Sequence, residues 1–185
     1  MNGRKRRPWG SDSRNGVSGA PGAVHIDVVP VPSDASTEDV VTATLAAFAE
    51  HEQMESMETA GLLLDELRTA GLAVSGNEAT LEALARRQVD VLVLSESYTA
   101  PAGWKCHSCR TVGIGAAPIG CPQCGEQTVR ETNLMEEIVR LAERFGCTVE
   151  IVRNSDVLFD IDGVGCLLRY LLPEQRMARL QENPV

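Results

Sequence analysis

The spacing of apolar residues changes along the chain, and each change predicts a different element. Between residues 38 and 70 apolar side chains recur every three or four positions, which predicts a helix. Two faces contribute, one made by Val41, Leu45 and Phe48 and the other by Met57, Ala60, Leu64 and Leu67. Candidate N-caps precede this stretch over residues 33–37, and Gly71 is the predicted C-cap. The pattern leaves open whether there is one helix or two, with a break at His51-Glu52 or Gly61.

After Gly71 the apolar runs become shorter and richer in β-branched residues. Residues 72–74 fit a short strand, and Asn77 is the predicted N-cap of a helix that turns Leu81, Leu84 and Ala85 inward. Residues 89–94 (VDVLVL) are almost continuously aliphatic, which predicts a strand buried on both faces, as in a parallel sheet.

The same alternation resumes after a cysteine-containing segment. Asn133 is the predicted N-cap of a helix whose apolar stripe contains Leu134, Ile138, Leu141 and Phe145, and Gly146 ends it. We expect a strand over residues 147–152, a short extended piece over 157–161 and a glycine-led buried strand over 163–170. A short polar helix or a frayed tail follows Pro173. Helices that alternate with aliphatic strands indicate a small layered α/β domain, interrupted by the cysteine segment.

The first part of the chain differs from this pattern. Residues 1–23 are rich in Gly, Ser, Pro and Arg without periodicity, which predicts a disordered basic tail. Residues 24–31 (VHIDVVPV) resemble a short strand, which Pro30 and Pro32 confine to an edge.

Composition restricts the possible functions. Aromatic residues make up only 4% of the chain, so its core must be aliphatic. The net charge is −9, and because the first fourteen residues carry +4, the remainder carries −13. The negative charge of this part of the chain repels the phosphate backbones of nucleic acids, so generic nucleic-acid binding is disfavoured. No apolar run is long enough for a membrane span, and the basic N-terminus lacks the apolar stretch of a signal peptide, so we expect a cytoplasmic protein.

Two C-x-x-C pairs form the strongest motif. Cys106 and Cys109 stand in C-H-S-C, and Cys121 and Cys124 stand in C-P-Q-C-G after a spacer of eleven residues. Two such turns can each supply two thiolates to a tetrahedral metal ion, and Gly125 follows the second pair, where a positive φ is often needed. The sequence therefore predicts a structural zinc site in a reducing compartment, because four cysteines leave no position open for water.

Other chemistry at the cysteines is disfavoured by the pattern. A redox dithiol would need only one pair, while an iron centre of the rubredoxin sort uses the same ligands as zinc. His107 could replace one thiolate, although four cysteines already complete the ligand set. Cys147 and Cys166 stand in predicted strands and are interpreted as buried free thiols.

Residues elsewhere provide no catalytic constellation. The Gly163-x-Gly165 pair lacks the third glycine and the following helix of a nucleotide loop, and indicates close backbone packing. The acids Asp156, Asp160 and Asp162 do not have the spacing of a calcium loop and are interpreted as a solvated edge. Residues 95–97 (SES) follow a strand end without a histidine nearby in sequence. We therefore predict a protein that is not an enzyme.

Three segments together resemble a known family. Residues 72–96 (LAVSGNEATLEALARRQVDVLVLSE), 134–152 (LMEEIVRLAERFGCTVEIV) and 163–170 (GVGCLLRY) are similar to the third domain of the archaeal and eukaryotic class-1 peptide release factors and of Pelota, a family with bacterial relatives such as Balon. Archaeal members carry a cysteine minidomain between the same halves. The resemblance implies an α/β sandwich of the ribosomal kink-turn-binding type with an inserted zinc ribbon.

The resemblance also implies a domain organisation and a function. Residues 24–70 would be the end of a preceding domain and a connector helix, residues 71–172 the third domain with its zinc insertion at 100–130, and 173–185 a C-terminal tail. In the family this domain docks a translational GTPase or contacts the ribosome. The G-G-Q tripeptide of peptide release is absent from these 185 residues, and so is the codon-reading domain, so peptide release by this chain alone is excluded and it could be a fragment of a longer protein. Residues 159–162 (FDID) also replace the family's glycine-rich approach to its last strand.

We therefore expect a translation-related interaction domain acting in release, rescue or hibernation. Its expected partners are a translational GTPase, the ribosome or both. Two alternatives remain at this point: an α/β domain that binds RNA directly, and a zinc-ribbon module for protein interactions unrelated to translation.

Overall fold

The computed structural model describes residues 28–153 and 155–182, and the chain divides into two compact units, residues 1–47 and 48–185. The predicted basic tail lies outside the described residues, as do residues 24–27 of the predicted first strand. The remaining part of that prediction, residues 28–31, contains no strand.

One helix, α1 (Thr37–Arg68), passes from the first unit into the second without a break at His51 or Gly61. Its N-terminus is capped reciprocally: the Asp39 amide donates to Ser36 Oγ at 3.2 Å, and Asp39 Oδ2 accepts from the Ser36 amide at 2.9 Å. Hydrogen bonds with the Ser36 side chain and then its amide lower the pKa of Asp39. At the other end Ala70, not Gly71, takes the positive φ of 50°.

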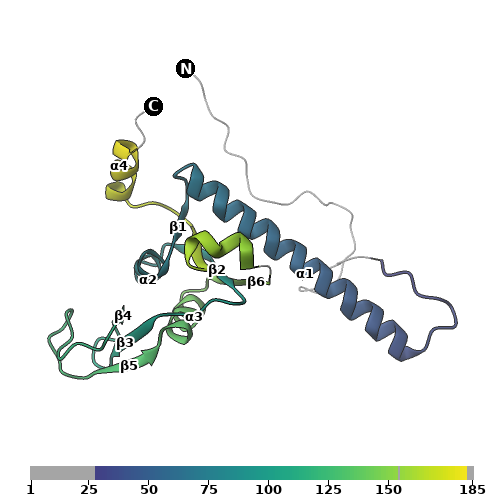
Figure 1. The fold of residues 1–185 in the computed structure, drawn as a ribbon, viewed down its shortest axis with the longest axis horizontal. Helices are drawn as coiled ribbons and strands as arrows, with labels where there is room; N and C mark the ends of the chain where they lie inside the picture. The colour runs from purple at the N-terminus through teal and green to yellow at the C-terminus, as the bar shows by residue number, and fades with distance from the viewer. Residues whose placement is uncertain (1–27, 154, 183–185) are drawn as a thin grey trace, which may run out of the picture. The chain divides into compact units, whose positions relative to one another are not determined.

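A four-stranded mixed sheet forms the centre of the second unit (Figure 1). Its strands are β1 (Ala73–Ser75), β2 (Val89–Ser95), β6 (Thr148–Val152) and β7 (Val164–Leu168), in the order β1-β7-β2-β6. Strand β2 runs parallel to β6 and antiparallel to β7. The prediction that β2 and β7 are buried strands is confirmed, because both are central and all five residues of β7 are buried.

Helices cover both faces of this sheet. On one face lie α2 (Asn77–Ala85) and α3 (Leu134–Arg144), whose Leu84 and Ile138 contribute to a core with Leu92 and Cys166. On the other face the second half of α1 and the 3-10 helix η1 (Ser155–Ile161) enclose a second core. The predicted layered α/β architecture, with helices packed on a central sheet, is thus confirmed.

Some local predictions were wrong. Residues 157–161 form η1 and not an extended piece. Gly76, with φ of 81°, precedes α2 in the position predicted for Asn77, and Ala85 is exposed. In α1 the helix buries Leu63, not Leu64. The prediction that Asn133 caps α3 is confirmed, since its side chain accepts from the amides of residues 135 and 136.

The cysteine segment forms a second sheet of three antiparallel strands between β2 and α3. These are β3 (Ala102–Cys106), β4 (Val112–Ile114) and β5 (Val129–Asn133), in the order β4-β3-β5. Asn133 is both the last residue of β5 and the N-cap of α3, so this sheet continues directly into the body of the domain. After β7 the chain ends in α4 (Pro173–Glu182).

Candidate metal centre

The two C-x-x-C turns have matching backbone hydrogen bonds. In the first, the Arg110 amide donates to the Cys106 carbonyl at 2.9 Å, and in the second the Gly125 amide donates to the Cys121 carbonyl at 2.8 Å. Arg110 and Gly125 follow their pairs directly and have φ values of 63° and 77°. The positive φ predicted at Gly125 is therefore confirmed. The same requirement at Arg110 was missed, because arginine gives no sequence signal for it.

The four sulfur atoms lie together at the end of the second sheet. All four are within 4.8 Å of one another, with 3.7 Å between Cys106 and Cys124 and 3.5 Å between Cys109 and Cys121. A zinc–sulfur bond of about 2.3 Å implies a tetrahedron edge of about 3.8 Å, whereas a disulfide needs about 2.05 Å. The four cysteines therefore form a cluster whose spacing suits a tetrahedral metal ion.

Hydrogen bonds to the sulfurs prepare part of this cluster for ionisation. A backbone hydrogen bond from Cys109, assisted by Ser108 and Thr128, lowers the pKa of Cys106 to about 6 against desolvation. The Thr111 hydroxyl, 3.1 Å from the Cys109 sulfur, lowers the pKa of that thiol too. At Cys124 the Glu126 amide favours the thiolate, but desolvation and the three neighbouring sulfurs raise the pKa to about 12. Four thiolates at this spacing consequently need a cation among them.

A small apolar cluster packs around two of the cysteines. The indole of Trp104 on β3 is buried with Cys106 and Cys121, and Ala117 and Val129 pack beside them. Gly113 on β4 leaves room for the indole, since a Cβ there would stand 2.3 Å from it. This cluster is too small to be a core by itself, so a metal ion held by the four cysteines would add to the stability of the segment.

An ion-pair network joins the second sheet to the body. The carboxylate of Glu137 on α3 is 6% exposed and accepts from Lys105 Nζ of β3 at 2.7 Å and from Arg140. Burial would raise the pKa of Glu137, but the hydrogen bond and charge of Lys105, with Arg140, outweigh it and lower the pKa. Gly103 also packs closely on α3, because a Cβ there would meet the Leu134 Cβ at 2.9 Å.

His107 lies beside the cysteine cluster but is not part of it. Its side chain is exposed and lines a groove of about 380 Å³ with Lys105, Arg110 and Arg130. Glu131, Thr132 and Glu137 complete the lining. The groove was not predicted, because its cations are distributed over two strands and a turn.

The other sequence candidates are distributed through the body of the domain. Cys166 is fully buried in β7, and desolvation raises its pKa to about 12, which confirms a buried thiol. Cys147 is only half-buried and donates its S–H to the Val89 carbonyl at 3.3 Å. Gly165 packs tightly, since a Cβ there would meet Leu63 at 2.9 Å, so the close packing predicted at this pair is confirmed.

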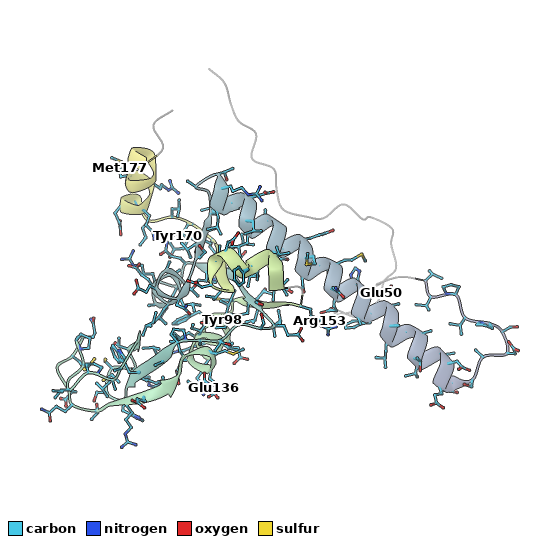
Figure 2. The ribbon with its side chains drawn as sticks, in the orientation of Figure 1. Glu50, Tyr98, Glu136, Arg153, Tyr170 and Met177 are labelled. Carbon is cyan, nitrogen blue, oxygen red and sulfur yellow. The ribbon has the colours of Figure 1, made fainter. Side chains whose placement is uncertain are left out.

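The remaining polar candidates do not assemble into a second site. Asp160 and Asp162 are exposed, and the side chain of Asp156 is outside the described residues. Tyr98 lies inside the body of the domain (Figure 2), and its hydroxyl donates to Asn77 Oδ1. Burial and then the charge of Asp162 raise the pKa of Tyr98 to about 12. Over the described residues, the four cysteines are the only group of three or more side chains placed to hold a metal ion.

Comparison with known proteins relates the chain to translation factors. No protein-family model matches it. It is 28% identical over 123 residues to peptide chain release factor subunit 1 of Thermococcus kodakarensis, covering 56% of this chain and 30% of that protein. The same factor from Thermoplasma acidophilum is 31% identical over 96 residues, covering 46% of this chain and 22% of the relative. The chain thus spans under a third of these relatives' length.

Solved structures with the same fold come from the same group. The C-terminal domain of a peptide chain release factor from Methanosarcina mazei superposes with a TM-score of 0.55 at 23% identity, covering 76% of this chain and 99% of that one. Pelota from Archaeoglobus fulgidus gives a TM-score of 0.51 at 18% identity, covering 80% of this chain and 40% of Pelota. The resemblance to the third domain of release factors and to Pelota is confirmed. Among the described helices none is long and apolar enough to cross a bilayer.

Proposed function

We propose that this chain is a non-catalytic interaction domain of the translation apparatus, which docks a translational GTPase, the ribosome or both. The observation that carries the proposal is the sequence similarity to archaeal release factor subunit 1, over a region with the fold of a release factor's C-terminal domain. The role would lie in release, rescue or hibernation, and it would place the protein in the cytoplasm. Residues 24–70 would be the end of a preceding domain and a connector, and 71–172 the docking domain.

We further propose that the cysteine cluster binds one structural zinc ion in a zinc ribbon inserted at residues 100–130. Support comes from the sulfur separations of 3.5 and 3.7 Å, close to the edge of a zinc–thiolate tetrahedron. Cys106, Cys109, Cys121 and Cys124 would complete the ligand shell, so the metal would shape a surface and not activate water. The expected finding is one zinc per chain by elemental analysis, with the four thiols unreactive until a chelator is added.

Docking is tested by cosedimentation and affinity capture with the whole chain. Purified protein carrying an affinity tag is mixed with ribosomes and with lysate from growing and from stressed cells, and ribosomal fractions and captured GTPases are identified by mass spectrometry. The expected result is cosedimentation with ribosomes, capture of a translational GTPase, or both, and in each case the interaction should weaken when the cysteines are changed to serine. Empty results in both assays, under both growth conditions, would contradict the proposal.

Direct RNA contact is a second candidate, favoured by one observation. The groove beside the metal centre gathers Lys105, Arg110 and Arg130 on a chain that is otherwise acidic. Phosphate oxygens bind such groups with a strong dependence on salt. If RNA binds there, a gel shift with ribosomal RNA should survive deletion of residues 1–23.

The charge-matched comparison decides whether that groove is responsible. The paired change Arg110→Gln and Arg130→Gln should abolish the RNA shift, while Arg68→Gln with Arg86→Gln removes the same charge from helix surfaces elsewhere and should leave it. Equal effects of both pairs would show that only the overall charge matters.

A further inference from the structure

Strand β6 is an open edge of the main sheet. Within the described part of the chain it pairs with β2 on one side and with no strand on the other. The carbonyl of Val152 accepts from the Glu96 amide at 2.9 Å, so it points toward β2. Because backbone groups alternate along a strand, the amides and carbonyls of Val149 and Ile151 point to the open side.

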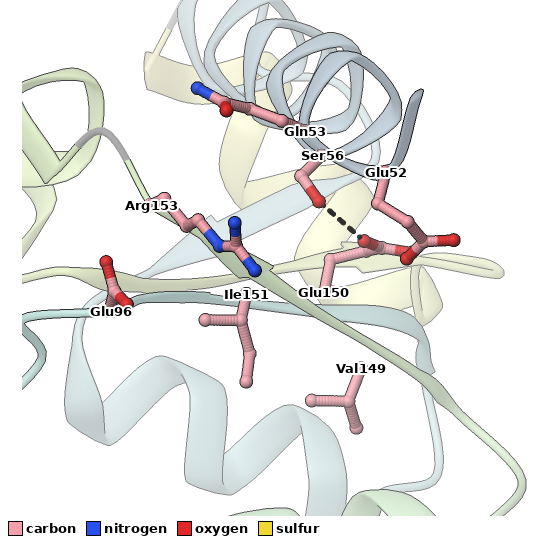
Figure 3. A pocket seen from close by; sticks show the side chains of 8 residues that line it. All are labelled: Glu52, Gln53, Ser56, Glu96, Val149, Glu150, Ile151 and Arg153. Carbon is pink, nitrogen blue, oxygen red and sulfur yellow. Dashed lines mark hydrogen bonds between the residues drawn. The ribbon is translucent and has the colours of Figure 1, made fainter. Parts of the chain in front are cut away.

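A groove runs beside this edge, between β6 and α1. It has a volume of about 430 Å³ and is lined by Glu52, Gln53 and Ser56 of α1, residues 149–151 of β6, and Glu96 and Arg153 at the ends of the strands (Figure 3). All of these residues belong to the second unit. Ile151 is 54% exposed, so the edge offers an apolar contact next to its unpaired backbone groups.

The edge lacks several of the features by which proteins usually protect an open strand, although Glu150 places one charge on it. The sequence of β6, TVEIV, contains no lysine and no proline, and its pairing with β2 is regular over five residues without a bulge. Such an edge is a template on which an extended peptide can add as a further strand. The open edge of β6 therefore supplies backbone donors and acceptors with which an added peptide strand would pair.

The charges around the groove select the kind of peptide. Three carboxylates, those of Glu52, Glu96 and Glu150, line it with a single guanidinium, that of Arg153. In the view of Figure 3 the carboxylates of Glu52 and Glu150 lie on one side of Arg153 and that of Glu96 on the other. Over the described residues none of these four groups forms an ion pair, and Glu150 accepts only from Ser56 Oγ at 3.1 Å. A phosphate backbone would be repelled here, whereas a cationic side chain would be attracted.

We propose that the groove receives an extended segment of a partner protein carrying arginine or lysine at alternate positions, which adds to β6 as a fifth strand. Its backbone bonds the amides and carbonyls of Val149 and Ile151, and its cations reach the carboxylates of the groove. The proposal does not depend on whether the partner belongs to the translation apparatus. A peptide measurement therefore tests it separately from the ribosome and GTPase assays.

The test uses a fluorescein-labelled probe peptide, Arg-Val-Arg-Val-Arg-Val, and the whole chain. Fluorescence anisotropy at physiological salt should show saturable binding. Ile151→Pro removes an outward amide at a place where proline is tolerated in edge strands, and should weaken binding about tenfold. Glu150→Gln should weaken it several-fold, whereas Glu143→Gln, which removes the same charge from the exposed side of α3, should not.

Two controls separate strand addition from unspecific attraction to an acidic protein. A probe with N-methyl groups on every backbone amide keeps its charge but has neither edge free to pair as a strand, and the wild-type protein should not bind it. This arm remains decisive if Ile151→Pro fails to fold, which circular dichroism will show. Equal binding of both probes, equal loss in Glu143→Gln and Glu150→Gln, or no binding of the unmethylated probe would each overturn the proposal.

Discussion

Replacing Glu137 by glutamine should loosen the attachment of the cysteine segment to the body of the domain. The carboxylate is 6% exposed and holds Lys105 of β3 at 2.7 Å, while Arg140 binds its other oxygen. Glutamine preserves the size of the side chain but removes the charge that both cations face. The change therefore isolates the electrostatic part of the contact between α3 and the second sheet.

The magnitude follows from the burial of the partners. Breaking a fully buried ion pair costs about 3–5 kcal/mol, and an exposed pair contributes about 0–1 kcal/mol. Glu137 belongs to the first case, but the Lys105 side chain is 27% exposed and can recover water when its partner is lost. We expect a decrease of about 2 kcal/mol in the free energy of unfolding, which lowers the Tm by about 4–8 °C in a chain of this size.

The assay is a double-mutant cycle measured by chemical denaturation, with all variants kept in the same buffer containing a small excess of zinc. Glu137→Gln, Lys105→Met and the double variant should show a coupling energy of about 1–2 kcal/mol. Glu82→Gln is the matched control, because Glu82 also holds its partner, Arg86, at 2.7 Å, but both side chains are well exposed. The Glu82→Gln variant should lose less than about 0.5 kcal/mol of unfolding free energy. A coupling below about 0.3 kcal/mol, or equal losses in the two glutamine variants, would refute this reasoning.

The same residue predicts a dependence on pH. Because its pKa is lowered in the folded protein, the Glu137 carboxylate contributes stability that is fully present above its unfolded pKa of about 4.3. That contribution is lost as the pH falls through the lower, folded pKa. The stability difference between wild type and Glu137→Gln should therefore be constant from neutral pH down to about 5 and shrink below about 4.

Three other changes test separate parts of the structure. Cys121→Ser removes a buried sulfur of the cluster and should reduce zinc, measured by elemental analysis, from about one per chain to a small fraction, because three thiolates leave the shell open. Gly165→Ala places a Cβ 2.9 Å from Leu63 and should destabilise the fold by about 1–3 kcal/mol in urea titrations, and the same change should cost less in a Leu63→Ala background. Asn133→Ala removes the N-cap of α3 and should cost about 1 kcal/mol, whereas Asn133→Asp should retain most of that stability.

Patterns that repeat over several residues were readable from the sequence. The aliphatic strands β2 and β7, the cap at Asn133 and the paired C-x-x-C turns each combine a residue type with a spacing that one kind of structure explains. The resemblance to release factors was recognised from the order of such segments. These features are local, so no knowledge of the tertiary contacts was needed to predict them.

Features that depend on contacts between distant segments were not readable. The pairing of Lys105 with Glu137 joins residues on β3 and α3, and nothing in either local pattern indicates it. The burial of Leu63 in place of Leu64 depends on where α1 contacts β7, because Leu63 packs over Gly165. The choice of η1 over an extended piece likewise reflects Leu158, which is fully buried against α1 and the sheet.

If the cysteine cluster binds a metal ion and the domain docks a partner, as proposed, the contacts around α3 explain how this small cluster can affect docking. Gly103 packs on Leu134, Lys105 binds Glu137, and Asn133 ends β5 while it caps the helix. Three independent contacts therefore fix the second sheet against the first turn of α3, and the metal cluster would stiffen its far end. Flexible loops would lose conformational entropy on binding a partner, whereas a sheet fixed at both ends has already lost it. A partner that touches the cysteine segment would then detect metal loss as weaker affinity, even where the body of the domain remains folded.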